Sequence, residues 1–197
     1  MARPQSQNYA EIKAAILRQA AALFARKGYA NSSIGDLTGA CGVSRGTLYH
    51  YFDSKDAILR EMMLEHITDM GSQVQGAIAV SDQPEQQLRN IIRAITALNA
   101  RSKNEQIVLM NDLGNLKAAE QGRVRELQNR IVDLVLGSLQ AVDKAKRLNR
   151  RNRKVYTMLV LGMINFTYAW YDPKGAVSPR ELAEIAGDMV LDGLGGR

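Results

Sequence analysis

The chain has 197 residues, a formal net charge of +6 and a hydrophobic content of 46%, which allows one or two small domains with a buried core. A single cysteine, Cys41, excludes an internal disulfide, and two histidines leave too few ligands to predict a metal site. The net positive charge is compatible with binding to nucleic acid, to an anionic membrane or to an anionic ligand, and does not distinguish among these partners.

The first ten residues are polar and lack the apolar core of a signal peptide. Together with the single cysteine, this predicts a cytoplasmic protein.

Apolar residues recur at helical spacing along the whole chain and predict an all-α protein with about nine helices. The first helix is expected over about 9–27, with Gly28 suited to end it. Ser33 is expected to cap the second helix, with Asp36 completing a capping box. Ser44 is expected to cap a third helix over about 44–51, so that Gly42 provides the turn between the two helices.

Six further helices are expected, beginning near Ser54, Pro84, Ile107, residue 118, residue 155 and Ser178. The first of these is expected to extend to about residue 79 and the one after residue 118 to about 142. The segment 155–171 is expected to form a helix that Asp172 and Pro173 end.

Residues 33–52 have the pattern of a helix-turn-helix, in which the start of the second helix enters the major groove. Leu48 is expected to face inward, which leaves Arg45, Tyr49 and His50 exposed. Arg45 is suited to bidentate recognition of guanine, and Lys55 to a phosphate at the start of the next helix. The alternative is a helical hairpin with solvated polar residues. The candidate DNA-binding residues are Ser33, Ser44, Arg45, Gly46, Thr47, Tyr49, His50, Tyr51 and Lys55.

Residues 12–63 resemble the N-terminal domain of the tetracycline-repressor (TetR) family. The resemblance is carried by the run GVSRGTLYHYFDSKD and by Phe24, Gly28, Tyr29, Ser33, Asp36 and Leu37. Thr38 and Cys41 depart from the alanines usual in the family, and Gly35 and Gly39 are atypical.

The resemblance implies a homodimer that binds a palindromic operator, usually as a repressor, and is released by a small molecule. It implies a helix-turn-helix DNA-binding domain over residues 1–53 and a ligand-binding and dimerisation domain over 54–197. The acidic and basic residues are scattered and form no Ser-His-Asp, paired-carboxylate or phosphate-cradling glycine pattern, so neither enzymatic activity nor a resident cofactor is expected. A helical ligand-binding protein without sequence-specific DNA binding is the alternative.

The segment 155–171 is apolar around nearly its whole circumference. A transmembrane helix fits poorly because the run is short and contains Asn165. A core helix, or a helix buried on one face by its own chain and on the other by a partner, remains open. The family resemblance favours the last interpretation, because TetR dimers usually pair their last two helices. Small residues such as Gly162, Ala183, Ala186 and Gly187 are expected to allow close approach in that interface.

A ligand pocket is expected from methionine, aromatic and polar residues of the C-terminal part. The candidates are Met70, Ile95, Met110, Asn111, Leu113, Met163, Phe166, Tyr168 and Trp170. Residues of this kind at helical spacing also occur in an ordinary core, which is the alternative for each of them.

Seven Lys or Arg and no acidic residue lie between Lys144 and Lys154. The run fits a solvated helix end or a site for a polyanion. The run MINFTYAWYDPKGAVSP also resembles TetR-family regulators of aromatic-acid or steroid breakdown. Several of those respond to acyl-coenzyme A thioesters, so a thioester of that class is one candidate for the small-molecule effector, whose identity the sequence leaves open. Arg150, Arg151 and Arg153 are then candidates for its phosphates.

Overall fold

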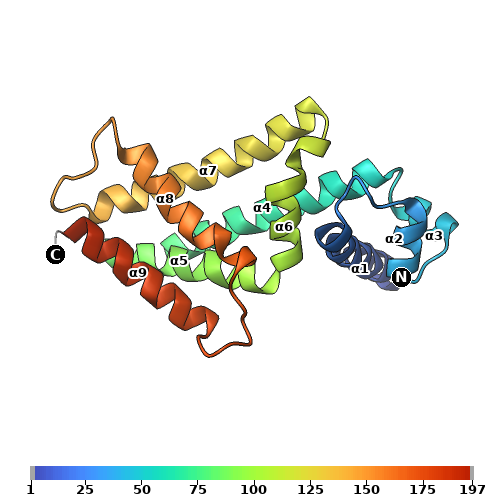
Figure 1. Ribbon diagram of the computed structural model, residues 1–197, viewed down its shortest axis with the longest axis horizontal. Coiled ribbons are helices and arrows are strands. Elements are labelled where there is room, and N and C mark those ends of the chain that lie inside the picture. The colour runs from blue at the N-terminus through green and yellow to red at the C-terminus, as the bar shows by residue number, and fades with distance from the viewer. Residues whose placement is uncertain (1–2, 196–197) are drawn as a thin grey trace. The chain divides into compact units, whose positions relative to one another are not determined.

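The computed structural model describes residues 3–195, and over this range the chain forms nine α-helices and two 3₁₀ helices without a β-strand (Figure 1). The prediction of an all-α protein is therefore confirmed. The elements are α1 (Arg3–Lys27), α2 (Ile34–Cys41), α3 (Arg45–Tyr51), α4 (Lys55–Ala79), α5 (Pro84–Arg101), α6 (Lys103–Asp112), η1 (Leu113–Asn115), α7 (Ala118–Val142), α8 (Arg153–Asn165), η2 (Phe166–Ala169) and α9 (Pro179–Gly195).

Three of the expected helices have different ends. The first helix, expected from about residue 9, begins at Arg3. The helix expected from Ile107 begins at Lys103, and α8 ends at Asn165 although a helix was expected to continue to residue 171. The carbonyl of Ile164 accepts a hydrogen bond from the Thr167 hydroxyl at 2.7 Å, where the chain changes to the tighter turn of η2. The apolar pattern continues through η2, so hydrophobicity alone did not reveal where the α-helix stops.

The chain divides into two compact units. Unit 1 holds the residues up to His66 together with Asn104–Val124, and unit 2 holds Ile67–Lys103 together with the residues from Arg125 onward. The family-based domain boundary at residues 53 and 54 stays a prediction.

Unit 1 is built around the inner face of α1, and Figure 1 shows α2 and α3 beside this helix. Ile16, Ala20 and Phe24 of α1 are almost fully buried, as are Leu37 of α2 and Leu48 of α3. Burying side chains of this size contributes roughly 1.5–3 kcal/mol each. The apolar core therefore fixes which side of α3 faces outward.

Unit 2 is centred on α5, whose apolar face supplies Leu88, Ile91, Ile92 and Ile95 to the core. α9 packs along α5, and Glu184 of α9 accepts a hydrogen bond from Arg93 at 2.5 Å. α8 and η2 also contact α5. α5 thus holds the last two helices in place.

None of the helices within residues 3–195 has both the length and the hydrophobicity needed to cross a membrane. The same part of the chain contains no cluster of three or more His, Cys, Asp or Glu arranged to hold a metal ion.

Candidate nucleic-acid interface

The start of α2 is fixed by the expected capping box. The Ser33 hydroxyl accepts from the Asp36 amide at 3.1 Å, and the Asp36 carboxylate accepts from the Ser33 amide at 2.8 Å. Lys27 donates to the same carboxylate at 2.7 Å. The Lys27 ammonium and the Ser33 donors hold the pKa of Asp36 well below its ordinary value. Ser33, a candidate DNA contact, therefore has a structural role at this helix start.

The turn between α2 and α3 depends on a glycine. Gly42 has a φ of 65°, in the left-handed region, and the amide of Val43 donates to the Thr38 carbonyl at 3.2 Å. Glycine adopts this conformation readily because it has no Cβ. The turn holds α3 at a defined angle to α2, as a helix-turn-helix requires.

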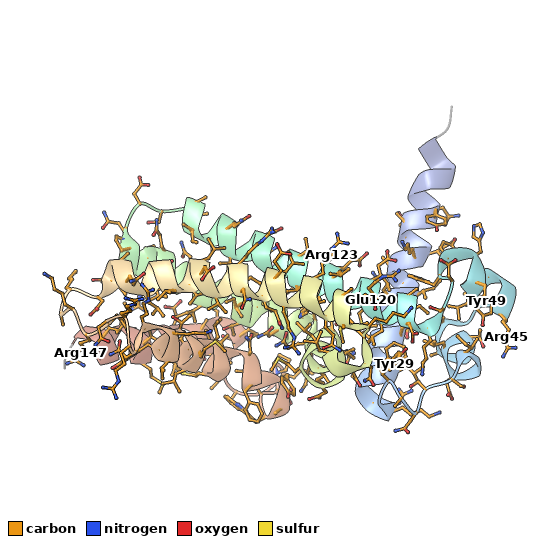
Figure 2. The ribbon with its side chains drawn as sticks, turned by 90° about the horizontal axis from the view of Figure 1, so that it is seen from above. Tyr29, Arg45, Tyr49, Glu120, Arg123 and Arg147 are labelled. Carbon is orange, nitrogen blue, oxygen red and sulfur yellow. The ribbon has the colours of Figure 1, made fainter. Side chains whose placement is uncertain are left out.

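The start of α3 is held by Ser44. Its hydroxyl accepts from the Thr47 amide at 3.0 Å and lies 2.8 Å from the Thr47 hydroxyl. Leu48 points into the core with 1% of its surface exposed, whereas its neighbour Tyr49 is 46% exposed. Figure 2 shows Arg45 and Tyr49 projecting outward from unit 1.

The structure brings most of the candidate DNA-binding residues together on the outer face of α3. The residues exposed there are Ser44, Arg45, Gly46, Thr47, Tyr49 and His50. This face offers a guanidinium, hydroxyls, a phenol and an imidazole, which are groups that bind phosphates and base edges.

An aromatic cluster braces the end of α3 against α1. The ring of Tyr9 lies 4.6 Å from that of Tyr51 and 5.9 Å, edge-on, from that of His50. Tyr51 is half-buried as a result, and His50 remains exposed. From the sequence, residue 9 is predicted only as the start of a helix. Its role depends on a tertiary contact, and an aromatic residue beside a polar N-terminal segment was the only available signal.

Lys55 anchors the loop between α1 and α2. Its ammonium donates to the carbonyls of Tyr29 at 2.9 Å and Ser32 at 2.8 Å, and lies 4.1 Å from the centre of the Tyr29 ring. Two of its three donors are used in this way. A contact between Lys55 and a DNA phosphate stays a prediction, and only the remaining donor is free to make it.

Tyr29 itself is held by two acidic residues of unit 1. Its hydroxyl donates to the Asp56 carboxylate at the start of α4, and its backbone amide donates to Asp112 at the end of α6. Burial and the Asp56 carboxylate raise the pKa of the Tyr29 phenol well above its ordinary value. The phenol therefore stays protonated and remains a donor at physiological pH.

The candidate ligand residues fall in different environments. Met70 and Ile95 are buried, Leu113, Met163 and Tyr168 are half-buried, and Met110, Asn111, Phe166 and Trp170 are exposed. Met110, Asn111 and Leu113 come from the end of α6 and the start of η1. Phe166, Tyr168 and Trp170 come from η2 and its end, where the Phe166 and Tyr168 rings lie 5.8 Å apart. The ligand-binding role of all nine stays a prediction.

Large apolar side chains remain exposed along α8 and α9. They are Val155, Met158, Leu159, Ile185 and Met189, and Phe166 continues the row at the end of α8. A groove of about 370 Å³, lined in part by Leu159, Met163 and Met189, lies between the two helices. The expectation that Ala183, Ala186 and Gly187 lie in an interface is wrong. All three are buried within the chain, because this side of α9 faces α5, and a side chain at Gly187 would meet Arg89 at 3.2 Å.

The basic run forms an ordered loop between α7 and α8. The Asp143 carboxylate accepts from the amides of Arg147 and Leu148 at 2.9 and 2.7 Å, and Arg147, labelled in Figure 2, donates to the Gly193 carbonyl at 2.7 Å. Lys144 pairs with Glu85. The remaining cations of the run are Lys146, Arg150, Arg151, Arg153 and Lys154, all of which are exposed.

Two family models match this chain. The model described as "Bacterial regulatory proteins, tetR family" matches residues 16–62. The model described as "Tetracyclin repressor-like, C-terminal domain" matches residues 81–194. The two matches cover most of the residues that form units 1 and 2.

Three known proteins show how far the similarity extends. A TetR-family transcriptional regulator from Bordetella parapertussis 12822 is 35% identical, with a TM-score of 0.87 and coverage of 92% of this chain and 94% of that one. The transcriptional repressor KstR2 of Rhodococcus jostii (strain RHA1) is 25% identical over 184 residues, covering 91% of this chain and 89% of that protein. The crystal structure of AibR with isovaleryl coenzyme A and operator DNA shares the fold, with 22% identity, a TM-score of 0.78 and coverage of 90% and 97%.

Proposed function

Because the chain belongs to the TetR family of bacterial transcriptional regulators, we propose that it is a homodimeric repressor that a small molecule releases from its operator. The observation that carries the proposal is the exposed polar face of α3, with Arg45 and Tyr49 outward and Leu48 inward. In this orientation α3 enters a major groove, and its N-terminal residues contact base edges.

Dimerisation through α8 and α9 would bring a second copy of α3, from the partner subunit, to the operator. Leu159 and Met189 are 66% and 62% exposed, and a continuous exposed apolar surface of this kind marks a protein–protein interface. The α3 helices of the two subunits then bind successive half-sites about 34 Å apart on one face of the DNA. The dimer therefore explains both the apolar helix faces and the palindromic operator expected for this family.

We propose an acyl-coenzyme A thioester as the effector. AibR has been crystallised with isovaleryl coenzyme A and operator DNA, and the exposed cations of the loop between α7 and α8 suit the phosphates of such a ligand. A ligand that shifts the helices of unit 2 would change the separation between the α3 helices of the two subunits. A coupling of about 1–3 kcal/mol is enough to change operator affinity 5- to 150-fold.

The effector class is tested by calorimetric titration of the purified protein with acyl-CoA thioesters and the matching free acids. Binding of a thioester, weakened when Arg150, Arg151 and Arg153 are neutralised together, supports the proposal. Binding that is unchanged in this triple variant, or no binding of any thioester, contradicts it.

Operator binding is tested with DNA from the chain's own promoter region in a mobility-shift assay. We expect a specific complex whose affinity falls steeply with salt, because each phosphate contact releases counterions. Equal affinity for promoter DNA and an unrelated duplex would instead favour a ligand-binding protein without sequence-specific DNA binding.

A further inference from the structure

One buried polar atom in unit 2 has no hydrogen-bond partner. Asn99 lies on α5 with 2% of its surface exposed, and its side-chain oxygen is the only buried side-chain N or O atom without a partner in the part of the chain that the structure describes. Leaving a buried acceptor unpaired is unfavourable, and such atoms are rare in folded proteins. The position of this one therefore needs an explanation.

The orientation of the Asn99 amide is fixed by its nitrogen. Nδ2 donates to Oδ1 of Asn165 at 3.1 Å and to the carbonyl of Ile164 at 3.4 Å. Both partners accept in this arrangement, so turning the amide over would place its oxygen against the Ile164 carbonyl oxygen. The nitrogen holds the end of α8, and the oxygen is directed elsewhere.

Three other buried polar side chains of unit 2 behave differently. The hydroxyls of Ser138, Thr157 and Thr167 each donate to a backbone carbonyl three or four residues earlier in the chain. Such hydroxyls are satisfied locally and are common in helices. Asn99 is thus distinct from these three in keeping a buried amide oxygen without a partner.

The surroundings of Asn99 include residues that are candidates for ligand binding. Ile95 lies one turn earlier on α5 and is fully buried, and η2, which carries Phe166 and Tyr168, contacts α5. η2 begins at the residue after Asn165, where α-helical geometry gives way to a 3₁₀ turn. A short 3₁₀ turn has poorer hydrogen-bond geometry than an α-helix and so opens at lower cost.

We propose that Oδ1 of Asn99 recognises the effector by accepting a hydrogen bond from a neutral donor, a hydroxyl or an amide N–H carried on an apolar body. This inference rests on the proposed function, in that unit 2 binds a small molecule. A carboxylate is excluded at this position, because it has no donor when ionised and the buried polar residues of the described part of unit 2 include no cation to pair with it.

The hydrogen-bond donor of the effector can come from two chemical sources. The pantetheine arm of a coenzyme A thioester contains amide N–H groups and a hydroxyl, whereas a hydroxylated ring supplies a hydroxyl alone. Either source places a donor beside the Asn99–Asn165 contact. Binding there acts on the end of α8, the helix that carries part of the proposed dimer surface.

The experiment is protein-observed NMR of the ¹⁵N-labelled full chain, read at the Asn99 side-chain amide signals. The probes are phenol, its methyl ether anisole, benzoate and pantetheine. We expect phenol to shift the Asn99 signals and to bind at least about fivefold tighter than anisole, the ratio that one buried hydrogen bond provides. A shift with pantetheine assigns the donor to the coenzyme arm, and a shift with phenol alone assigns it to a ring hydroxyl. Benzoate is expected to leave the signals unchanged.

Two variants separate recognition from helix stability. Asn99→Leu should reduce the affinity for phenol to that for anisole. Thr167→Val is the matched control, because it removes the other side-chain hydrogen bond to the Ile164 carbonyl and leaves Oδ1 of Asn99 in place. It should preserve the preference for phenol. The comparison of phenol with anisole on the unaltered chain remains decisive if Asn99→Leu does not fold.

No shift of the Asn99 signals by either phenol or pantetheine at millimolar concentration would overturn the proposal. Equal binding of phenol and anisole, together with no shift by pantetheine, would also overturn it. Operator binding is measured on the same samples by mobility shift. If operator binding is intact while these outcomes occur, only the effector inference fails. If the chain binds no operator, the proposed repressor function fails independently of the NMR result.

Discussion

Arg60 on α4 and Glu120 near the start of α7 form an ion pair, with 3.0 Å between Nη1 and Oε1, although sixty positions separate them in the chain. The second oxygen of Glu120 accepts from the backbone amide of Lys117, just before α7 begins. Glu120 thus joins the start of α7 to α4, the helix that follows α3. Arg60 and Glu120 both belong to unit 1. This contact gives the corner between α6 and α7 a direct connection to α4.

The pair is partly exposed, so its own contribution to stability is small. A double-mutant cycle with Arg60→Met and Glu120→Gln should give a coupling free energy of about 0.2–1 kcal/mol in urea denaturation, measured at one fixed protein concentration. A coupling above about 2 kcal/mol would contradict this, because it would mean that the two charges are far more shielded from water than the structure shows.

Neighbouring residues on opposite sides of α3 should have separate effects. Tyr49→Ala should strongly weaken operator binding and leave dimerisation and the melting temperature nearly unchanged, because Tyr49 faces outward. Leu48→Ala should destabilise the fold by about 2–5 kcal/mol through the cavity it leaves. Mobility shift and thermal unfolding measure the two effects. If Tyr49→Ala retains full operator affinity, the proposed orientation of α3 on DNA is wrong.

Acid should weaken the cap of α2. The folded-state pKa of Asp36 lies below its ordinary value of 3.8, so its stabilising effect is present above that pH and is lost as the pH falls below it. The stability difference between the unaltered chain and Asp36→Asn should therefore be constant from pH 7 to about 5 and shrink below about 4. Denaturant unfolding at each pH measures it. A difference that grows on acidification would show that the carboxylate is not stabilised in the folded state.

A charge placed on the exposed face of α8 should break the dimer. Leu159→Glu is expected to give a monomer in size-exclusion chromatography with light scattering, because burying an unpaired carboxylate in an apolar interface is unfavourable. Val80→Glu is the matched control, since Val80 is also highly exposed and lies outside α8 and α9. A dimer that survives Leu159→Glu would place the interface elsewhere.

The sequence predicted what depends on local chemistry. The capping residues Ser33 and Ser44 and the Gly42 turn act over three or four positions, and the structure has them as expected. The run from Gly42 to Asp56 was sufficient to indicate the family. These features define where α2 and α3 begin and the turn that joins them.

Features that depend on tertiary packing were not predicted. Tyr9 and Asn99 gained their roles from partners on other helices, 42 and 66 positions away along the chain. Ala183 and Ala186 were assigned to an interface because small residues suit close packing, and the structure shows that the close neighbour is α5 of the same chain. Periodicity identifies an apolar face but does not identify the surface that covers it.

The central claim, that α3 reads an operator, is tested most directly by fluorescence anisotropy with promoter DNA and two arginine variants. Arg45 on α3 and Arg123 on α7 are both exposed residues of unit 1 (Figure 2), so replacing either with alanine removes one surface charge. Arg45→Ala should weaken specific binding by about 1–3 kcal/mol relative to an unrelated duplex, as loss of a bidentate base contact does. Arg123→Ala should leave that ratio unchanged. Equal effects of the two variants would contradict the account, because Arg45 would then contribute only non-specific charge.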